Sequence, residues 1–144
     1  MLMSYLQSIN YLAVLASGLA FVALGFLWYS PILFAKPWSK MMGFDMSSKA
    51  KIAEMQKKAG PAYAASFVGA LIQSVAIAVL LKTLPNLNIG QAALFGALLW
   101  LGLQAPFSLS GVLYAQKPLK LWYIDSGYQL VGLVIAASIL QAWK

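Results

Sequence analysis

The chain has 144 residues, of which 62% are hydrophobic and only 9% are charged. Soluble globular domains contain about 45–50% apolar and about 25% charged residues, so this composition excludes an ordinary soluble domain and predicts a protein that folds in lipid. Cysteine, histidine and arginine are absent and the net charge of +7 comes from lysine, which excludes disulfides, thiolate metal sites and histidine-based catalysis.

The first predicted membrane-spanning helix occupies about residues 9–30, within a run of 35 residues that carries no charged side chain. A cleaved signal peptide would begin with basic residues and end at a small-residue cleavage site. This segment begins without lysine and ends in a Leu-Trp-Tyr run, so we expect a span. Pro31 should end or kink the helix because proline lacks an amide donor and disfavours helical geometry at Ser30.

The segment 36–60 changes character, because it holds six of the ten lysines and two of the three acids. Its first part interleaves lysines with aromatic and methionine side chains, which is typical of a segment at the level of the lipid headgroups. Residues 47–59 predict a short, weakly amphipathic helix in the cytoplasm, in which Glu54 can meet Lys58 one turn later. We expect a solvated connector; a sensor of lipid headgroups is the alternative.

The second predicted span occupies about residues 62–81 and begins after Gly60-Pro61, since proline is tolerated at the first helical position. Small side chains recur at every fourth residue and predict a stripe that lets a neighbouring helix approach closely. The members of this helix-packing stripe are Ala62, Ser66, Ala70, Ser74 and Ala78. We interpret the stripe as a packing face.

The third and fourth predicted spans occupy about residues 91–114 and 121–143. Pro106 lies near the middle of the third span and should bend it, because proline frees the carbonyl of residue 102 from its intrahelical hydrogen bond. In the fourth span Gly132 and Ala136 form a small-xxx-small pair that favours close helix packing.

The distribution of lysines predicts the topology. The loop between the first two spans holds six lysines and the loop between the last two holds two, whereas the other side of the membrane has Lys82 and Lys144 only. Cytoplasmic loops carry the excess of positive charge, so both lysine-rich loops should lie in the cytoplasm and both termini outside it. This pattern accounts for the basic character, and we expect no nucleic-acid binding.

Asp125 is the one acid inside a predicted span, and ionisable groups in membranes are functional suspects. It lies about one turn from the cytoplasmic surface, where the helix N-terminus favours a carboxylate and Lys117 or Lys120 could pair with it. A structural acid of this kind and a proton or cation site are both consistent with the sequence.

Other polar side chains in the spans predict a cluster around Asp125. Tyr128 and Gln129 follow it at i+3 and i+4, and Gln104 and Ser108 flank the expected bend in the third span. If the two spans face each other, the cluster could bind a small polar solute or conduct ions. Interhelical hydrogen bonding, worth about 0.6 kcal/mol per contact on average, is the alternative.

An aromatic motif marks the cytoplasmic end of the first span. It consists of Trp28, Tyr29, Ser30, Pro31 and Trp38. Tryptophan and tyrosine at such a boundary are typical of aromatic belts that hold helices at headgroup depth, and we interpret the motif as an interfacial anchor. A pocket for an amphipathic ligand is the second interpretation.

The stretch Gly25-Phe26-Leu27-Trp28-Tyr29-Ser30-Pro31-Ile32-Leu33-Phe34, followed by Lys36, Trp38 and Gly43, resembles a family of small bacterial membrane proteins catalogued only as a domain of unknown function. Lys117-Pro118-Leu119-Lys120 and Gly127-Tyr128 are similar to the final helix of the same family. The resemblance covers nearly the whole chain, and the Trp-Tyr-Ser-Pro run is its most specific part. Family members often have an amide where this chain has Asp125, so an acid there need not be general. The resemblance implies a four-helix membrane domain and supplies no activity.

We therefore expect one all-α membrane domain over 1–144, with four transmembrane helices arranged as two hairpins and a short cytoplasmic amphipathic helix. The first functional hypothesis is a non-enzymatic subunit that packs against itself or other membrane proteins. The second is a small-molecule or ion transporter whose pathway passes Asp125. We expect the lipid bilayer of the bacterial inner membrane as its location, and we expect no catalytic residues, cofactor or metal site.

Overall fold

The computed structural model describes all 144 residues, and its regular structure is helical throughout. Four stretches are long and apolar enough to cross a membrane, which confirms the predicted all-α polytopic fold. These spans are α2 (Tyr11–Trp28), α5 (Gly60–Thr83), the interrupted helix α6–η1–α7 and α8 (Leu119–Ala142). The third span comprises α6 (Ile89–Leu99), a π-helical segment η1 (Trp100–Gln104) and α7 (Ala105–Tyr114). Each bound lies within two residues of the predicted one.

Three short helices lie outside the spans. The expected cytoplasmic helix is α4 (Lys49–Lys58), whose first turn is capped by the Ser48 hydroxyl. The headgroup-level segment is also helical and forms α3 (Ala35–Met42), which ends at Gly43 with a φ of 80° that only glycine adopts readily. The helix α1 (Leu2–Ser8) was not expected, because its seven residues show no clear amphipathic pattern.

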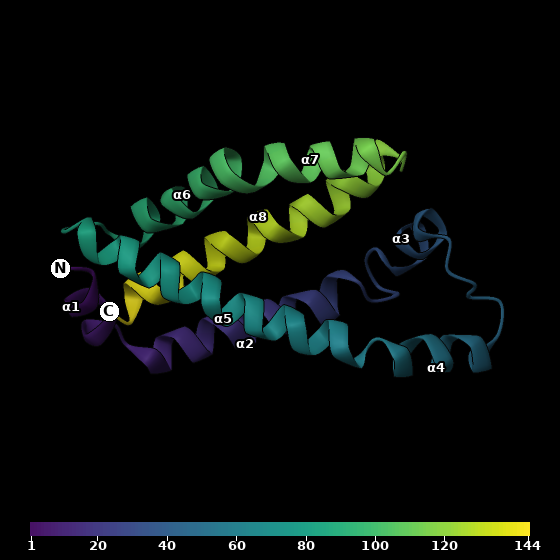
Figure 1. The fold of residues 1–144 in the computed structure, drawn as a ribbon, viewed down its shortest axis with the longest axis horizontal. Helices are drawn as coiled ribbons and strands as arrows, with labels where there is room; N and C mark the ends of the chain where they lie inside the picture. The colour runs from purple at the N-terminus through teal and green to yellow at the C-terminus, as the bar shows by residue number, and fades with distance from the viewer.

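Figure 1 shows how the spans are arranged. The helix α8 is central: α2 and α5 pack on one side of it, and α6, η1 and α7 pack on the other. The third span makes no comparable contact with α2 or α5, so the four spans form two hairpins joined through α8 and do not close into a compact bundle. Both chain termini lie at one end of the molecule, and α3 and α4 lie at the opposite end.

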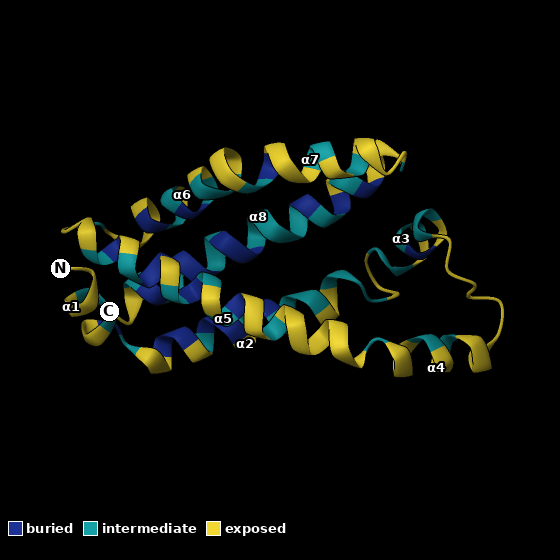
Figure 2. Cartoon of the chain, viewed as in Figure 1, coloured by how far each residue is buried: buried dark blue, intermediate teal, exposed yellow.

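The buried core lies where α2, α5 and α8 meet, toward the end that carries the termini, as the dark segments of Figure 2 show. At its centre the hydroxyls of Ser17 and Ser74, both fully buried, hydrogen-bond across α2 and α5 at 2.9 Å. The ring of Phe21 packs directly over Gly132, so any side chain at that position would overlap it. Small residues therefore set the distances between these helices.

A glycine also brings α6 close to α8. A Cβ atom placed on Gly96 would lie 2.6 Å from the backbone oxygen of Leu133 and 3.1 Å from the Cβ of Ala137. Since a backbone atom cannot rotate away as a side chain can, this contact requires glycine. It is a main point of attachment for a span that packs chiefly on α8.

The expected bend at Pro106 takes the form of a π-helical segment on its N-terminal side. The Ala105 amide donates to the carbonyl of Trp100, five residues earlier, instead of four. Proline removes one donor from the ladder, and a π-bulge is one of the local adjustments that restores hydrogen bonding around such a gap. The interruption thus precedes the proline and does not follow it.

Three of the five members of the predicted helix-packing stripe on α5 pack inside the protomer. Ala70, Ser74 and Ala78 are buried, whereas Ala62 and Ser66 are exposed. At about 100° per residue, every fourth position advances about 40° around the helix, so five such positions drift by about 160°. The stripe therefore winds from an exposed face onto the buried face.

Candidate functional site

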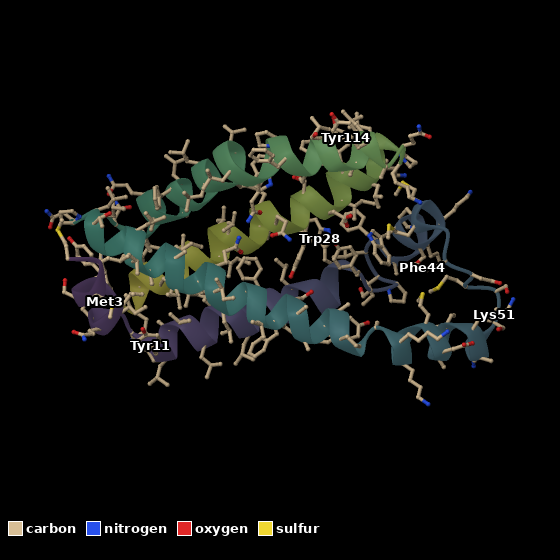
Figure 3. All side chains as sticks on the ribbon, viewed as in Figure 1. Met3, Tyr11, Trp28, Phe44, Lys51 and Tyr114 are labelled. Carbon is tan, nitrogen blue, oxygen red and sulfur yellow. The ribbon has the colours of Figure 1, made fainter.

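The end of α2 is attached to α8 by two aromatic side chains. The indole N–H of Trp28 donates to the carbonyl of Ile124 at 2.9 Å, and the Tyr29 hydroxyl donates to Oδ1 of Asp125 at 2.7 Å. Figure 3 places Trp28 between the end of α2 and α8. The two side chains hydrogen-bond to a helix of the same chain, a contact that the interpretation as interfacial anchors did not include.

Two glycines make room for these rings. A Cβ on Gly127 would lie 3.2 Å from the Trp28 ring, and a Cβ on Gly25 would lie 3.3 Å from the hydroxyl oxygen of Tyr128. That hydroxyl donates to the backbone carbonyl of Phe21 at 2.9 Å. Trp28, Tyr29 and Tyr128 are therefore each held by a hydrogen bond as well as by packing.

Trp38 adds a third element to the site, because α3 folds back toward α8. Its ring lies 5.2 Å from the Tyr29 ring in an edge-to-face arrangement, and Tyr29 lies 5.6 Å from Tyr128 in a similar one. The buried indole N–H of Trp38 lies beside the Asp125 carboxylate without reaching hydrogen-bond geometry. We name Tyr29, Trp38, Asp125 and Tyr128 the acid–aromatic cluster.

No lysine pairs with Asp125. The expected partners were Lys117 and Lys120, but the Lys117 ammonium instead approaches the carbonyl of Met41 at the end of α3, at 3.5 Å. The two ion pairs of the protein join Lys51 to Asp45 and Lys58 to Glu54, both in the loop between the first two spans. The predicted lysine pairing is therefore wrong, and a tyrosine hydroxyl takes that place.

The structure gives the polar residues that the sequence grouped together different partners where it shows partners at all. Asp125 and Tyr128 face α2, whereas Ser108 in α7 accepts from the indole N–H of Trp122 at 2.9 Å. Gln104 has a buried side-chain oxygen without a hydrogen-bond partner, and Gln129 is half-buried. Because α8 has α2 on one face and the third span on another, its polar residues are divided between two sets of neighbours.

Sequence reasoning missed Trp28 and Tyr29 as partners of α8. Aromatic residues at a membrane boundary usually signal an anchor, and nothing in that signal indicates an inward direction. The available hint for Trp28 was Gly127, since a glycine opposite a large ring allows close approach.

Residues 12–141 match the family described as "Protein of unknown function (DUF1761)". This covers nearly the whole chain, from the start of α2 to the end of α8. The protein belongs to the DUF1761 family. No curated protein and no solved structure matches it.

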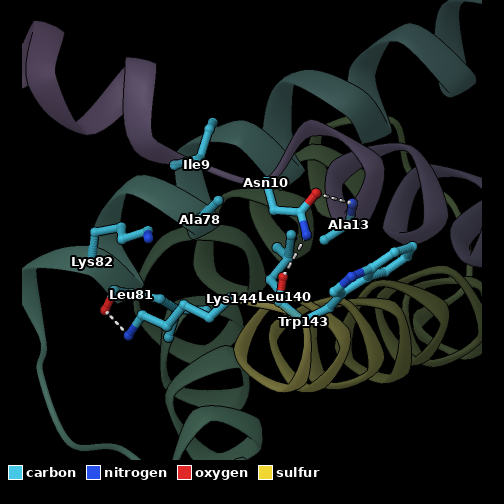
Figure 4. Close-up of a pocket in the computed structure, with 9 residues that line it drawn as sticks. All are labelled: Ile9, Asn10, Ala13, Ala78, Leu81, Lys82, Leu140, Trp143 and Lys144. Atoms are coloured by element: carbon cyan, nitrogen blue, oxygen red, sulfur yellow. Dashed lines mark hydrogen bonds between the residues drawn. The ribbon is translucent and has the colours of Figure 1, made fainter.

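In this DUF1761 member the end opposite the acid–aromatic cluster is also tied together by polar contacts, shown in Figure 4. The Asn10 side chain caps α2 and donates to the carbonyl of Trp143 at 3.0 Å, and the Lys144 ammonium donates to the carbonyl of Leu81 at 2.8 Å. Partial burial, together with the nearby charge of Lys82, lowers the pKa of Lys144 below its usual range. These contacts join the ends of α2, α5 and α8.

In this chain no three acidic, histidine or cysteine side chains come together in a way that could hold a metal ion. The acid–aromatic cluster offers one carboxylate, a tyrosine hydroxyl and aromatic rings. Its chemistry therefore favours a ligand that is held by the charge of the carboxylate and by the ring faces over a coordinated metal ion.

Proposed function

We propose that this protein is a non-enzymatic membrane subunit that assembles with copies of itself through an exposed face of α5. One observation carries the proposal: the exposed face consists of small residues around one polar side chain. Its members are Ala62, Ala65, Ser66, Gly69, Gln73 and Ala76, all exposed except the half-buried Gln73. At about 100° per residue they fall within about 100° of one another, which makes one continuous seam along the helix.

A seam of this composition favours a second helix over lipid. Helices in membranes associate where small residues allow their backbones to approach, and polar side chains then hydrogen-bond across the contact. A Cβ placed on Gly69 would meet no atom within 4 Å, so nothing within the protomer covers this part of the seam. None of the side-chain hydrogen bonds in the protomer involves Gln73.

A second copy of the chain suits the seam because the seam is self-complementary. In a two-fold symmetric contact the same residues meet across the axis, so Gln73 of one protomer would meet Gln73 of the other. Each amide carries both donors and an acceptor and can satisfy the other. The open arrangement of the third span leaves further surface for larger assemblies.

The proposed location is the bacterial inner membrane, with both termini outside the cytoplasm. The two loops at one end of the molecule carry eight of the ten lysines, and the opposite end carries Lys82 and Lys144. Positive charge is concentrated on the cytoplasmic side of membrane proteins, which supports this orientation.

Disulfide cross-linking tests the contact directly, because the chain has no cysteine of its own. Gly69→Cys in native membranes should give a cross-linked dimer upon mild oxidation. The matched control is Val68→Cys, which is exposed at nearly the same depth but lies about 100° around the helix. Equal cross-linking at the two positions, or none at Gly69→Cys, would contradict an α5 contact; co-purification of a different protein would then favour a mixed complex.

Transport of a small solute or ion is the second candidate function. The observation that favours it is the Asp125 carboxylate, which lies in a span without a lysine partner. Such groups mark ion and substrate pathways in many membrane proteins. In reconstituted vesicles, a solute or proton flux that Asp125→Asn abolishes would support transport, and unaltered permeability of the wild-type vesicles would reject it.

A further inference from the structure

Asp125 differs from the other two acids of the protein in its charge balance. Asp45 and Glu54 each bond a lysine, at 2.6 Å and 3.0 Å, whereas Asp125 bonds only the neutral hydroxyl of Tyr29. Its second oxygen, Oδ2, accepts no hydrogen bond from the chain, although the side chain is half-buried. A carboxylate in a span is destabilised unless positive charge or several donors compensate it. The chain supplies one bonded donor, the Tyr29 hydroxyl, and the indole N–H of Trp38 beside the carboxylate, but no positive charge.

The surroundings of this carboxylate are aromatic. The rings of Tyr29 and Trp38 have centroids 5.2 Å apart, and those of Tyr29 and Tyr128 are 5.6 Å apart. The faces of such rings attract cations, most strongly when the cation carries apolar substituents and is partly removed from water. A hard metal ion would need about six oxygen ligands, and only one carboxylate and one hydroxyl are at hand.

The cluster is also held in place before any ligand arrives. The hydroxyl of Tyr128 is fixed on the Phe21 carbonyl at 2.9 Å, and that of Tyr29 is fixed on Asp125 at 2.7 Å. Side chains that are already ordered lose little freedom upon binding, which improves affinity. The Lys117 ammonium is directed at the Met41 carbonyl and forms no ion pair with the carboxylate.

We propose that the acid–aromatic cluster binds an organic ammonium cation, with its charge beside Asp125 and its apolar groups against the rings of Tyr29, Trp38 and Tyr128. The cation is either a free amine or the ammonium headgroup of a lipid, because both present the same chemistry at this depth. The proposal names the substrate class for the second candidate function. It does not depend on the α5 contact.

Binding is measured by calorimetry with benzyltrimethylammonium as the probe, on the full chain in maltoside micelles that contain no amine. We expect one saturable site per protomer, and no saturable binding of benzyl alcohol, which keeps the ring but lacks the charge. Asp125→Asn should weaken binding at least tenfold. Trp38→Leu should weaken it about 2- to 30-fold, the range expected for one cation–π contact.

One control separates the site from general effects. Asp45→Asn removes an acid in the loop, outside the cluster, and should leave affinity unchanged. If Asp125→Asn does not fold, Trp38→Leu still tests the site, since Trp38 lies outside the spans. The proposal would be overturned if both Asp125→Asn and Trp38→Leu bound the probe with the affinity of the wild-type protein. It would also be overturned if the wild-type protein showed no saturable binding.

A second arm identifies the source of the cation. Phosphatidylethanolamine added to the micelles should compete with the probe if a lipid headgroup occupies the site, and should have no effect if the ligand is a free amine. Binding without flux in vesicles would keep the site and reject transport. Loss of cross-linking at Gly69→Cys with binding intact would reject only the α5 contact.

Discussion

Replacing Gly96 tests how the third span is attached. In Gly96→Ala the new methyl group would lie 2.6 Å from the Leu133 oxygen and 3.0 Å from its carbonyl carbon. The backbone of α8 cannot move aside without disturbing its own ladder, so α6 must shift outward. Overpacking of this kind costs about 1–3 kcal/mol.

The matched control is Gly111→Ala in the same span, where a methyl group would meet no atom within 4 Å. Both substitutions gain the same helix propensity, so that contribution cancels between the two variants. The free energy of unfolding of Gly96→Ala should therefore lie about 1–3 kcal/mol below that of Gly111→Ala. It is measured by titrating dodecylmaltoside micelles with dodecyl sulfate and following tryptophan fluorescence. Equal unfolding free energies would refute the close approach of α6 to α8.

Three further predictions concern other contacts. A double-mutant cycle of Ser17→Ala and Ser74→Ala, measured by the same titration, should give a coupling of about 0.6 kcal/mol and at most about 1.7 kcal/mol; zero coupling would contradict the hydrogen bond between them. Asn10→Ala removes the cap of α2 and the bond to Trp143, and the unfolding free energy should fall by about 1 kcal/mol, an expectation that an unchanged value would refute. The hydrogen bond from Lys51 lowers the pKa of Asp45 from 3.8 to about 2, so the contribution of this ion pair is complete above pH 3.8 and is lost as the pH falls through about 2. A carboxyl titration followed by NMR should show that midpoint, and Lys51→Met should raise it; an unshifted midpoint in that variant would be evidence against the pair.

The sequence predicted the fold class because the membrane imposes one length and one composition on every span. In lipid, a charge-poor run of about 20 residues forms a spanning helix, and the chain has four such runs. Prolines and glycines mark their ends. The short helices were harder to predict, since α1 has seven residues and α3 eight. Helices of that length depend on tertiary contacts and capping more than on their own sequence.

The candidate site was predicted only in part. Asp125 stood out because an acid in a span is rare, but its partners depend on which face of α8 meets which helix. The sequence could not show that α2 covers the face of α8 with Asp125 and Tyr128. Nor could it show that the third span covers the face with Trp122, which donates to Ser108, and Ser126, which accepts from the indole N–H of Trp100. The same uncertainty grouped Ser108 with Asp125, whereas Ser108 accepts a hydrogen bond from Trp122.

The mass of the native assembly in lipid nanodiscs tests the proposed function most directly. A single chain has a mass of 15.6 kDa. We predict a mass of two or more protein copies per assembly, reduced to one copy by Gly69→Leu, which fills the seam on α5. A wild-type protein that remains a single protomer at every protein-to-lipid ratio would contradict the account.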